Sequence, residues 1–293
     1  MPGLSGCAQP FDGPCGQQPV ASVPVRIVQD VPLISVVLNG RPATLLLDTG
    51  AQPFLLTQAA VARLNLATDA GMRVGIGGIG GRSRSFAAVL RGIELTPGFR
   101  LPDTYAGILA TPLPTPGGIR VDGLLGVGVL NRWDIELDMP RRRMVLHAGS
   151  LCSGPPSGFA NAAMLRSTAT TGGRFIIPMT LDGANLRALV DTGAQSSIVS
   201  RDVAAQAGMT DAMLAADPAQ VLTGVGADQV PARQHRFREI RIGDDVVAQP
   251  LLTVMPPVQG IDTAILGFDY LAHHRLWLSA ARNLVFIARP DPP

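Results

Sequence analysis

The stretch "LLLDTGAQPFLL", residues 45–56, places one carboxylate, Asp48, at the end of an apolar run. An ionised side chain is costly to bury, so a chain that drives three leucines into an aspartate needs a reason. The same motif recurs in "ALVDTGAQSSIV", residues 188–199, where Asp191 ends a second apolar run. The recurrence indicates that the chain contains two copies of one unit.

The residues around the two aspartates repeat as well. Asn39-Gly40 and Asp182-Gly183 precede the acids at equal spacing, each between two apolar runs. These dipeptides predict tight hairpins, so the second strand of each hairpin should end at its acid. After each acid an Ala-rich stretch begins at Thr57 or Ser200, and both residue types favour the N-cap of a short helix.

Further along, Leu124-Leu125-Gly126 and Ile265-Leu266-Gly267 follow the acids at nearly equal distances, and each copy ends in a strand-turn-strand pattern. Short apolar runs separated by Gly and Pro predict mainly β lobes. The expected organisation is an irregular leader or tether over 1–24, an N-terminal lobe over 25–147, a Gly-, Ser-, Pro- and Thr-rich linker over 148–173, and a C-terminal lobe over 174–293.

Composition limits the class of protein. The chain has 293 residues, of which 46% are hydrophobic and 16% charged, as in globular proteins. The net charge is +2, all the basic residues are arginine, and no basic stripe accumulates, so nucleic acid is not an expected partner. No apolar run reaches the length of a membrane-spanning helix. The histidines lack metal-ligand spacing, so neither a metal nor another cofactor is expected.

The three cysteines leave two readings open. "LSGC", Leu4 to Cys7, has the pattern of a lipid-modified bacterial cysteine, which would tether an exported, periplasmic or outer-membrane protein, with Cys15 and Cys152 left to form a disulfide. Only "MPG" precedes this tetrapeptide, without the basic and apolar regions of a signal peptide. Either an export signal has been trimmed or the pattern is chance, in which case three free thiols in the cytoplasm are the alternative.

The paired Asp-Thr-Gly and apolar-apolar-Gly motifs resemble those of retropepsin-type aspartic proteases over about residues 25–290. "DTGAQ" with its small-residue helix is more similar to bacterial retropepsin-like enzymes and to the eukaryotic DNA-damage-inducible ubiquitin-shuttle proteases than to pepsin. The resemblance implies two β-barrel lobes related by a pseudo-twofold axis, with short helices and a central cleft. Because both copies lie in one chain, a monomer would replace the viral homodimer.

The resemblance also implies the chemistry of the two acids. Asp48 and Asp191 would share one proton and one water, since two adjacent carboxylates cannot both ionise cheaply. The ionised member would take a proton from water and the protonated member would donate to the substrate carbonyl. The apolar strands would then supply a dry, rigid floor. This interpretation answers why the leucines lead into an acid.

Neighbouring residues would hold this geometry. By the family pattern, Thr49 and Thr192 should hydrogen-bond across the axis and lock the lobes together. Gly50 and Gly193 should leave room for the carboxyls to become nearly coplanar. Ala51 and Ala194 stand where pepsins often carry hydroxyl residues, which predicts a pH optimum less acidic than that of pepsin.

Glycine-rich segments downstream of each acid predict a flap in each lobe, able to bend over substrate. The expected substrate-binding residues are Gly77, Gly78, Ile79 and Gly80 in the first copy and Gly224, Val225 and Gly226 in the second. Neither segment carries the tyrosine of the pepsin flap. Gly75, Gly77 and Gly80 also match a dinucleotide-binding pattern, but the strand-like residues after them and the missing βαβ alternation exclude it.

The sequence therefore predicts an aspartic endopeptidase that acts on a peptide or protein substrate, with apolar specificity and either a general or a regulatory role. A different class remains as the alternative, a non-catalytic peptide-binding or scaffolding lipoprotein that keeps the fold. The intact acids, threonines and glycines in both copies favour the enzyme.

Overall fold

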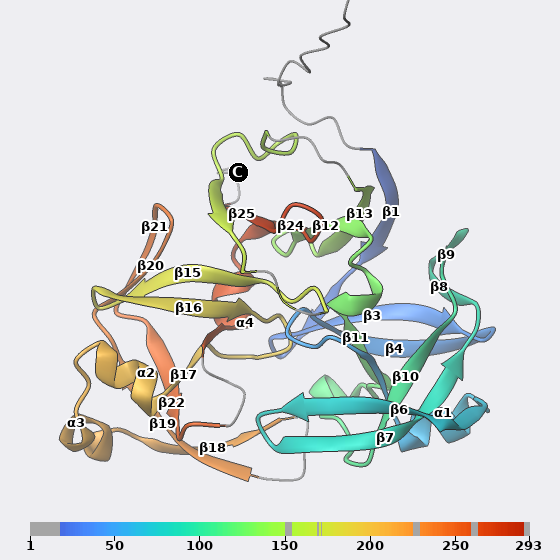
Figure 1. Ribbon diagram of the computed structural model, residues 1–293, viewed down its shortest axis with the longest axis horizontal. Helices are drawn as coiled ribbons and strands as arrows, with labels where there is room; N and C mark the ends of the chain where they lie inside the picture. Colours follow the sequence, from blue (N-terminus) through green and yellow to red (C-terminus); the bar gives the residue numbers. More distant parts are fainter. Residues whose placement is uncertain are drawn as a thin grey trace, which may run out of the picture.

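The computed structural model describes residues 18–149, 154–168, 170, 172–224, 229–258 and 263–289. In these residues the chain is mainly β, as predicted, and is built from three sheets (Figure 1). One sheet belongs to each half of the chain, and the third contains strands from both halves. Cys7, Cys15 and Cys152 lie outside the described residues, as do the lipid attachment and the disulfide predicted for them.

The first lobe is a ten-stranded sheet in the order β6-β7-β10-β5-β11-β4-β3-β8-β9, with β2 paired to β3. Its strands are β2 (Arg26–Val28), β3 (Val31–Leu38), β4 (Arg41–Asp48), β5 (Phe54–Thr57), β6 (Thr68–Gly78), β7 (Gly81–Leu90), β8 (Ile93–Thr96), β9 (Phe99–Leu101), β10 (Thr104–Leu109) and β11 (Gly123–Gly126). Its helices are α1 (Gln58–Arg63) and the 3-10 turns η1 (Pro116–Gly118) and η2 (Val127–Val129).

The second lobe is a nine-stranded sheet in the order β18-β19-β22-β17-β23-β16-β15-β20-β21, which repeats the first order strand for strand. Its strands are β15 (Ile176–Leu181), β16 (Ala184–Val190), β17 (Ile198–Ser200), β18 (Ala219–Thr223), β19 (Gln229–Arg236), β20 (Glu239–Ile242), β21 (Asp245–Ala248), β22 (Leu251–Met255) and β23 (Ala264–Leu266). Its helices are α2 (Arg201–Gln206), α3 (Asp211–Ala216) and α4 (Phe268–Leu271).

The local signals of the repeat produce the predicted elements. Asn39 and Asp182 have positive φ, as does the glycine after each, which is the backbone that a two-residue hairpin turn requires. These turns join β3 to β4 and β15 to β16. Thr57 and Ser200 cap α1 and α2, because each side chain accepts a hydrogen bond from a backbone N–H in the first turn of its helix.

The third sheet joins the two lobes. It contains six strands in the order β1-β13-β12-β24-β25-β14, where β1 is Pro19–Pro24, β12 is Trp133–Asp138, β13 is Arg143–Ala148, β14 is Ala163–Arg166, β24 is Arg275–Ser279 and β25 is Leu284–Ala288. Its centre is the antiparallel pair β12–β24, one strand from each half. Below it, one continuous apolar core contains residues of both lobes.

This sheet corrects two predictions of irregular structure. Residues 19–24 of the expected leader form β1, in which Ala21 and Val23 point into the core and the chain pairs with β13. Residues 163–166 of the expected linker form β14, which pairs with β25. Pro19 and Pro24 argued against a strand in the sequence, but proline is tolerated in a strand at the edge of a sheet, where β1 lies.

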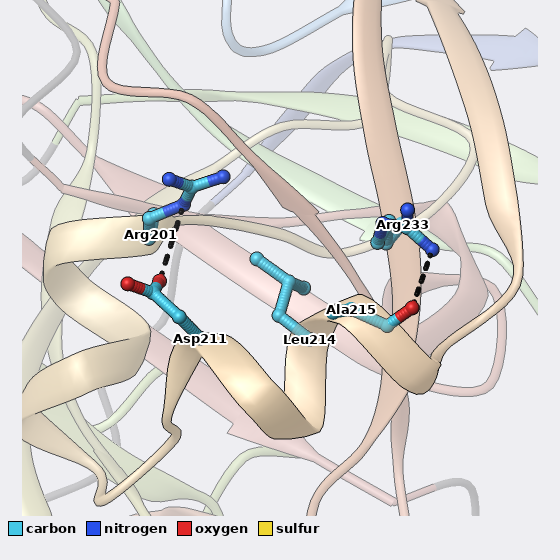
Figure 2. Close-up of a pocket in the computed structure, with 5 residues that line it drawn as sticks. All are labelled: Arg201, Asp211, Leu214, Ala215 and Arg233. Atoms are coloured by element: carbon cyan, nitrogen blue, oxygen red, sulfur yellow. Dashed lines mark hydrogen bonds and ion pairs between the residues drawn. The ribbon is translucent and has the colours of Figure 1, made fainter.

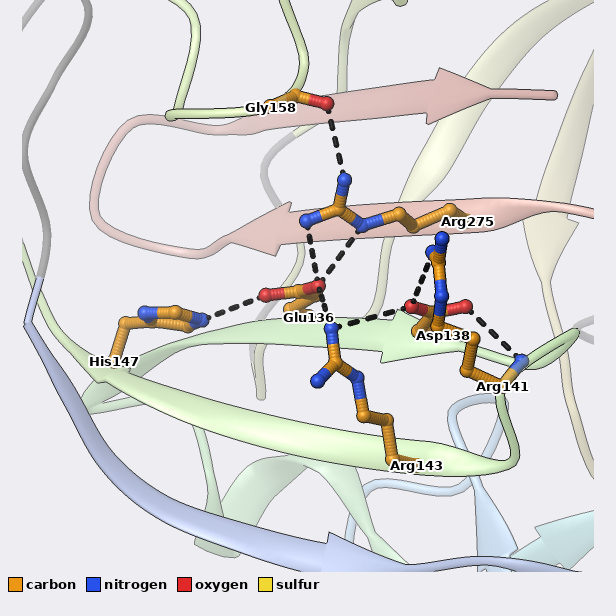
Figure 3. A network of polar contacts seen from close by, with 7 residues as sticks. All are labelled: Glu136, Asp138, Arg141, Arg143, His147, Gly158 and Arg275. Atoms are coloured by element: carbon orange, nitrogen blue, oxygen red, sulfur yellow. Dashed lines mark hydrogen bonds and ion pairs between the residues drawn. The ribbon is translucent and has the colours of Figure 1, made fainter. Parts of the chain in front are cut away.

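A buried charge network holds the two halves of this sheet together (Figure 3). Arg275 on β24 donates through Nε to Glu136 Oε1 on β12 at 2.9 Å and through Nη1 to Gly158 O at 3.0 Å. His147 Nε2 lies 2.9 Å from the other carboxylate oxygen of Glu136. Burial raises the pKa of Glu136, but the hydrogen bonds from His147 and Arg275 outweigh it and hold that pKa below its ordinary value.

Candidate active site

Asp48 and Asp191 reach the boundary between the lobes at equivalent points. Asp48 is the last residue of β4 and faces Gly126 in the parallel pair β4–β11. Asp191 follows β16, and its N–H donates to Leu266 O of β23 at 3.0 Å. The apolar-apolar-Gly strands β11 and β23 therefore run beside the two acid-bearing loops.

The two carboxyl groups are direct neighbours. A Cβ on Gly50 would lie 2.2 Å from Asp191 Cγ, and one on Gly193 would lie 2.5 Å from Asp48 Cγ, so each carboxyl group lies against the loop of the other acid. Burial raises the pKa of Asp48 well above its ordinary value, and the charge of Asp191 raises it further. Burial also raises the pKa of Asp191, and this effect outweighs the hydrogen bonds from Gly193 and Asp48, which lower it. The pair therefore favours a state that retains one proton between two acids.

The backbone after each acid wraps around its own carboxylate. Asp48 Oδ1 accepts a hydrogen bond from Ala51 N at 2.8 Å, and Asp191 Oδ1 accepts from Gly193 N at 2.8 Å and from Ala194 N at 3.2 Å. These bonds fix the side-chain rotamers without any side chain at position 51 or 194 larger than a methyl group. Of the predicted supporting residues, Ala51, Gly193 and Ala194 thus hydrogen-bond directly to an acid.

Two buried threonines connect the loops across the pseudo-twofold axis. Thr49 Oγ1 donates to Val190 O at 2.8 Å, and Thr192 Oγ1 donates to Leu47 O at 2.6 Å. Each hydroxyl also accepts the backbone N–H of the other threonine, at 3.1 and 3.0 Å. All four bonds run between the lobes, so the separation of the acids depends on them.

We expect Thr192→Val to lower the free energy of unfolding by about 2–4 kcal/mol, because it leaves Leu47 O and Thr49 N buried without partners. Urea unfolding measures the effect. The control is Thr57→Val, which removes a buried cap within one lobe and should cost about 1 kcal/mol. Equal losses in the two variants would contradict a special role for the interlobe bonds.

We expect Asp48→Asn to make stability less dependent on pH. Because the folded pKa of Asp48 is raised, its contribution is complete below the unfolded value of about 3.9 and is lost as pH rises through the folded value, at about 1.4 kcal/mol per pH unit. The asparagine variant should therefore gain stability over wild type between pH 4 and neutrality in urea unfolding. Asp211→Asn, an exposed acid on α3, should track wild type; a parallel curve for Asp48→Asn would count against the raised pKa.

Two residues that the sequence interpretation passed over brace the lobes. Gln195 Nε2 donates across the interface to Gln29 O, in the turn before β3, at 2.8 Å. The side chain of Gln52 packs on Gly172, before β15 in the other half, so closely that a Cβ on Gly172 would lie 2.3 Å from Gln52 Nε2. The signal was visible, since "DTGAQ" is identical in both copies through the glutamine.

The predicted flaps are hairpins on the side of the molecule opposite the six-stranded sheet (Figure 1). In the first lobe β6 and β7 carry Gly77 and Gly78 at the end of β6, with Ile79 and Gly80 as the turn. In the second lobe β18 and β19 form the equivalent pair. Gly224 follows β18, whereas Val225 and Gly226 lie outside the described residues.

The first hairpin reaches the other lobe. Ile79 packs on a C-terminal apolar cluster that contains Ile198, Ala232, Met255 and Ile265, and a Cβ on Gly224 would lie 3.0 Å from Ile79 Cβ. A matching cluster lies under the first hairpin and consists of Leu55, Ile76, Leu109 and Leu124. Each hairpin is thus anchored above an apolar cluster, and the two hairpins meet.

Other features of the described residues do not form a second centre of this kind. A pocket on the outer side of the second lobe is lined by Arg201, Asp211, Leu214, Ala215 and Arg233 (Figure 2). Arg233 donates there to Ala215 O at 3.2 Å, so it is already engaged. The described residues contain no group of three metal-ligating side chains, and no helix among them is long and apolar enough to cross a membrane.

Comparison with protein families agrees with the duplicated site. A family model described as "Aspartyl protease" matches residues 34–129, and one described as "gag-polyprotein putative aspartyl protease" matches residues 177–273. Each match includes one Asp-Thr-Gly loop and one flap hairpin. No curated protein matches the chain significantly. The chain therefore contains two aspartyl protease domains in tandem, consistent with a duplicated retropepsin-like protease.

Proposed function

We propose that this protein is an aspartic endopeptidase in which Asp48 and Asp191 together activate one water molecule. The observation that carries the proposal is the approach of the two acids, one from each domain, each of which lies against the glycine of the other loop while burial raises the pKa of both. Two acids that share a proton can act as base and acid in the same step, which amide hydrolysis requires.

The roles follow from the protonation of the pair. The ionised carboxylate accepts a proton from water as the oxygen attacks the peptide carbonyl, and the protonated carboxyl donates to the carbonyl oxygen. The hydrogen bonds from Gly193 and Ala194 stabilise the ionised form of Asp191. The interlobe threonine bonds keep the acids at one separation through the reaction.

An extended peptide under the two hairpins is the proposed substrate, paired with flap backbone as an added strand. The apolar clusters beneath β6–β7 and β18–β19 support a preference for apolar side chains on both sides of the cleaved bond. Because each domain contributes one acid, a single chain is sufficient for activity.

Incubation with a diverse peptide library, followed by mass spectrometry of the products, tests the proposal. We expect cleavage between apolar residues that pepstatin-type inhibitors suppress. Peptide binding without any cleavage would instead support the alternative, a peptide-binding scaffold that retains the protease fold.

A further inference from the structure

The outer face of the first flap is basic. Along β7 the side chains alternate between faces, and Ser85 is on the inner face, where its Oγ accepts Ile108 N of β10. Arg82, Arg84 and Phe86 therefore share the opposite, outer face. Phe86 is 44% exposed there, and the guanidinium of Arg73 on β6 lies 3.7 Å from the centre of its ring. Three arginines thus gather on one small hairpin.

Glycines leave space beside these arginines. Gly75 and Gly77 on β6 lie directly opposite Arg84 and Arg82. A Cβ on Gly75 would meet nothing within 4 Å, and one on Gly77 would meet only Arg82 Cγ at 3.6 Å. The result is a hollow lined by Gly75, Ile76, Gly77, Arg82, Ser83 and Arg84, called here the flap hollow.

The cations at the flap hollow have no acidic partner among the residues that the structure describes. Among the described residues, the side chains of Arg82 and Arg84 make neither an ion pair nor a hydrogen bond, whereas those of Arg63, Arg143 and Arg275 elsewhere all pair with acids. Two unpaired guanidinium groups beside open space favour a carboxylate ligand, because each can bind it with two parallel hydrogen bonds.

The described residues of the second flap form no such face, since the arginine on its outer side, Arg233, already donates to Ala215 O and Asp217 O. Leu222, Val230 and Ala232 lie on the inner side of β18–β19 with the C-terminal cluster. The outer side carries Val221, which is 60% exposed, opposite Pro231. The charge on the outer faces of the two flaps therefore departs from the pseudo-twofold symmetry of the domains, whereas the two acids follow that symmetry.

We propose that the flap hollow binds an acidic stretch of the protein substrate, outside the residues held over the two aspartates. This inference rests on the proposed protease function. It adds the class of substrate and the direction in which the peptide chain binds. A pseudo-symmetric site can bind a peptide chain in either of two directions. A basic surface on one flap alone makes one of these two directions more favourable than the other. The acidic stretch should consequently help on one side of the cleaved bond only.

Three peptides with the same cleaved core test this: one without extension, one with four glutamates added at the N-terminal end and one with them at the C-terminal end. For the full-length protein at low ionic strength, one extension should lower KM about 3- to 10-fold, and added salt should abolish the gain. The double variant Arg82→Gln/Arg84→Gln should lose the gain and cleave the unextended peptide normally. Gly75→Val, which fills the hollow but keeps its charge, should reduce the gain.

Arg187→Gln, an exposed arginine on β16 of the other lobe, is the matched control and should behave as wild type. The inference is overturned if both extensions act equally, if neither acts, or if the double variant keeps the gain. Binding of anionic vesicles that depends on Arg82 and Arg84, without any effect of the peptide extensions, would also overturn it. If no peptide is cleaved, the proposed function fails, and fluorescence anisotropy of the extended peptides then decides the flap hollow alone.

Discussion

Replacing either Asp48 or Asp191 with asparagine is expected to lower kcat by about 10³-fold or more, with little change in substrate affinity. Asparagine keeps the shape of the side chain but can neither accept the proton of water nor carry the shared proton. Because the two acids act as one unit, the double variant should lose little more than either single variant. Cleavage of a library-derived peptide, followed by mass spectrometry, measures all three.

The matched control for this experiment is Asp182→Asn. Asp182 lies in the hairpin turn before β16, at the position that Asn39 occupies in the other copy, so asparagine is already accepted by the fold there. Asp182 Oδ1 accepts backbone N–H groups at 2.8 and 2.9 Å, and an amide oxygen can replace it. Normal cleavage by Asp191→Asn would refute a shared role for the acids.

The sequence alone predicted the parts of the fold whose signals are local. Asn39-Gly40 and Asp182-Gly183 specify their hairpins because few residues other than glycine and asparagine or aspartate tolerate positive φ. Thr57 and Ser200 specify helix starts because each side chain accepts a hydrogen bond from the backbone N–H three residues later. The repetition of these signals then predicted two equivalent halves, and with them the approach of Asp48 and Asp191.

The parts that escaped prediction depend on partners far away in sequence. "PVASVP" at 19–24 reads as a loop until β13 is placed beside it, and "AMLR" at 163–166 needs β25. No local pattern links Arg275 to its partner Glu136, which is buried on a strand of the other half. Periodicity reports which side of a strand is apolar, but it does not report which strand lies next to it.

The same reasoning explains how the duplicated chain has diverged. Residues that contact their equivalents across the axis, such as Thr49 and Thr192, are constrained by each other, because a change in one breaks bonds of both. The outer faces of β6–β7 and β18–β19 are not bound by these contacts and are free to differ, as Arg84 on the first and Val221 on the second show. A fused pair of domains can therefore come to bind its substrate in one preferred direction through its flaps, while the arrangement of the two acids stays symmetric.

Replacing Gly50 with alanine is expected to lower kcat by about 10²-fold or more, although Gly50 contributes no side chain to the reaction. A Cβ at this position would lie 2.2 Å from Asp191 Cγ and 2.3 Å from Asp191 Oδ2, inside any tolerated contact. Asp191 must move, and an error of about 1 Å in the position of a reacting group is enough for a loss of this size. The carboxyls would no longer share their proton.

Gly193→Ala should have the same effect by symmetry, since its Cβ would lie 2.5 Å from Asp48 Cγ. Gly149→Ala is the control, because its Cβ would meet only Arg132 O at an ordinary 3.4 Å. Kinetics with one peptide and thermal unfolding should be measured together, so that lost activity is separated from lost structure. If Gly50→Ala retains the kcat of wild type, the two acids do not work at the separation that these glycines allow, and a single acid must carry the reaction.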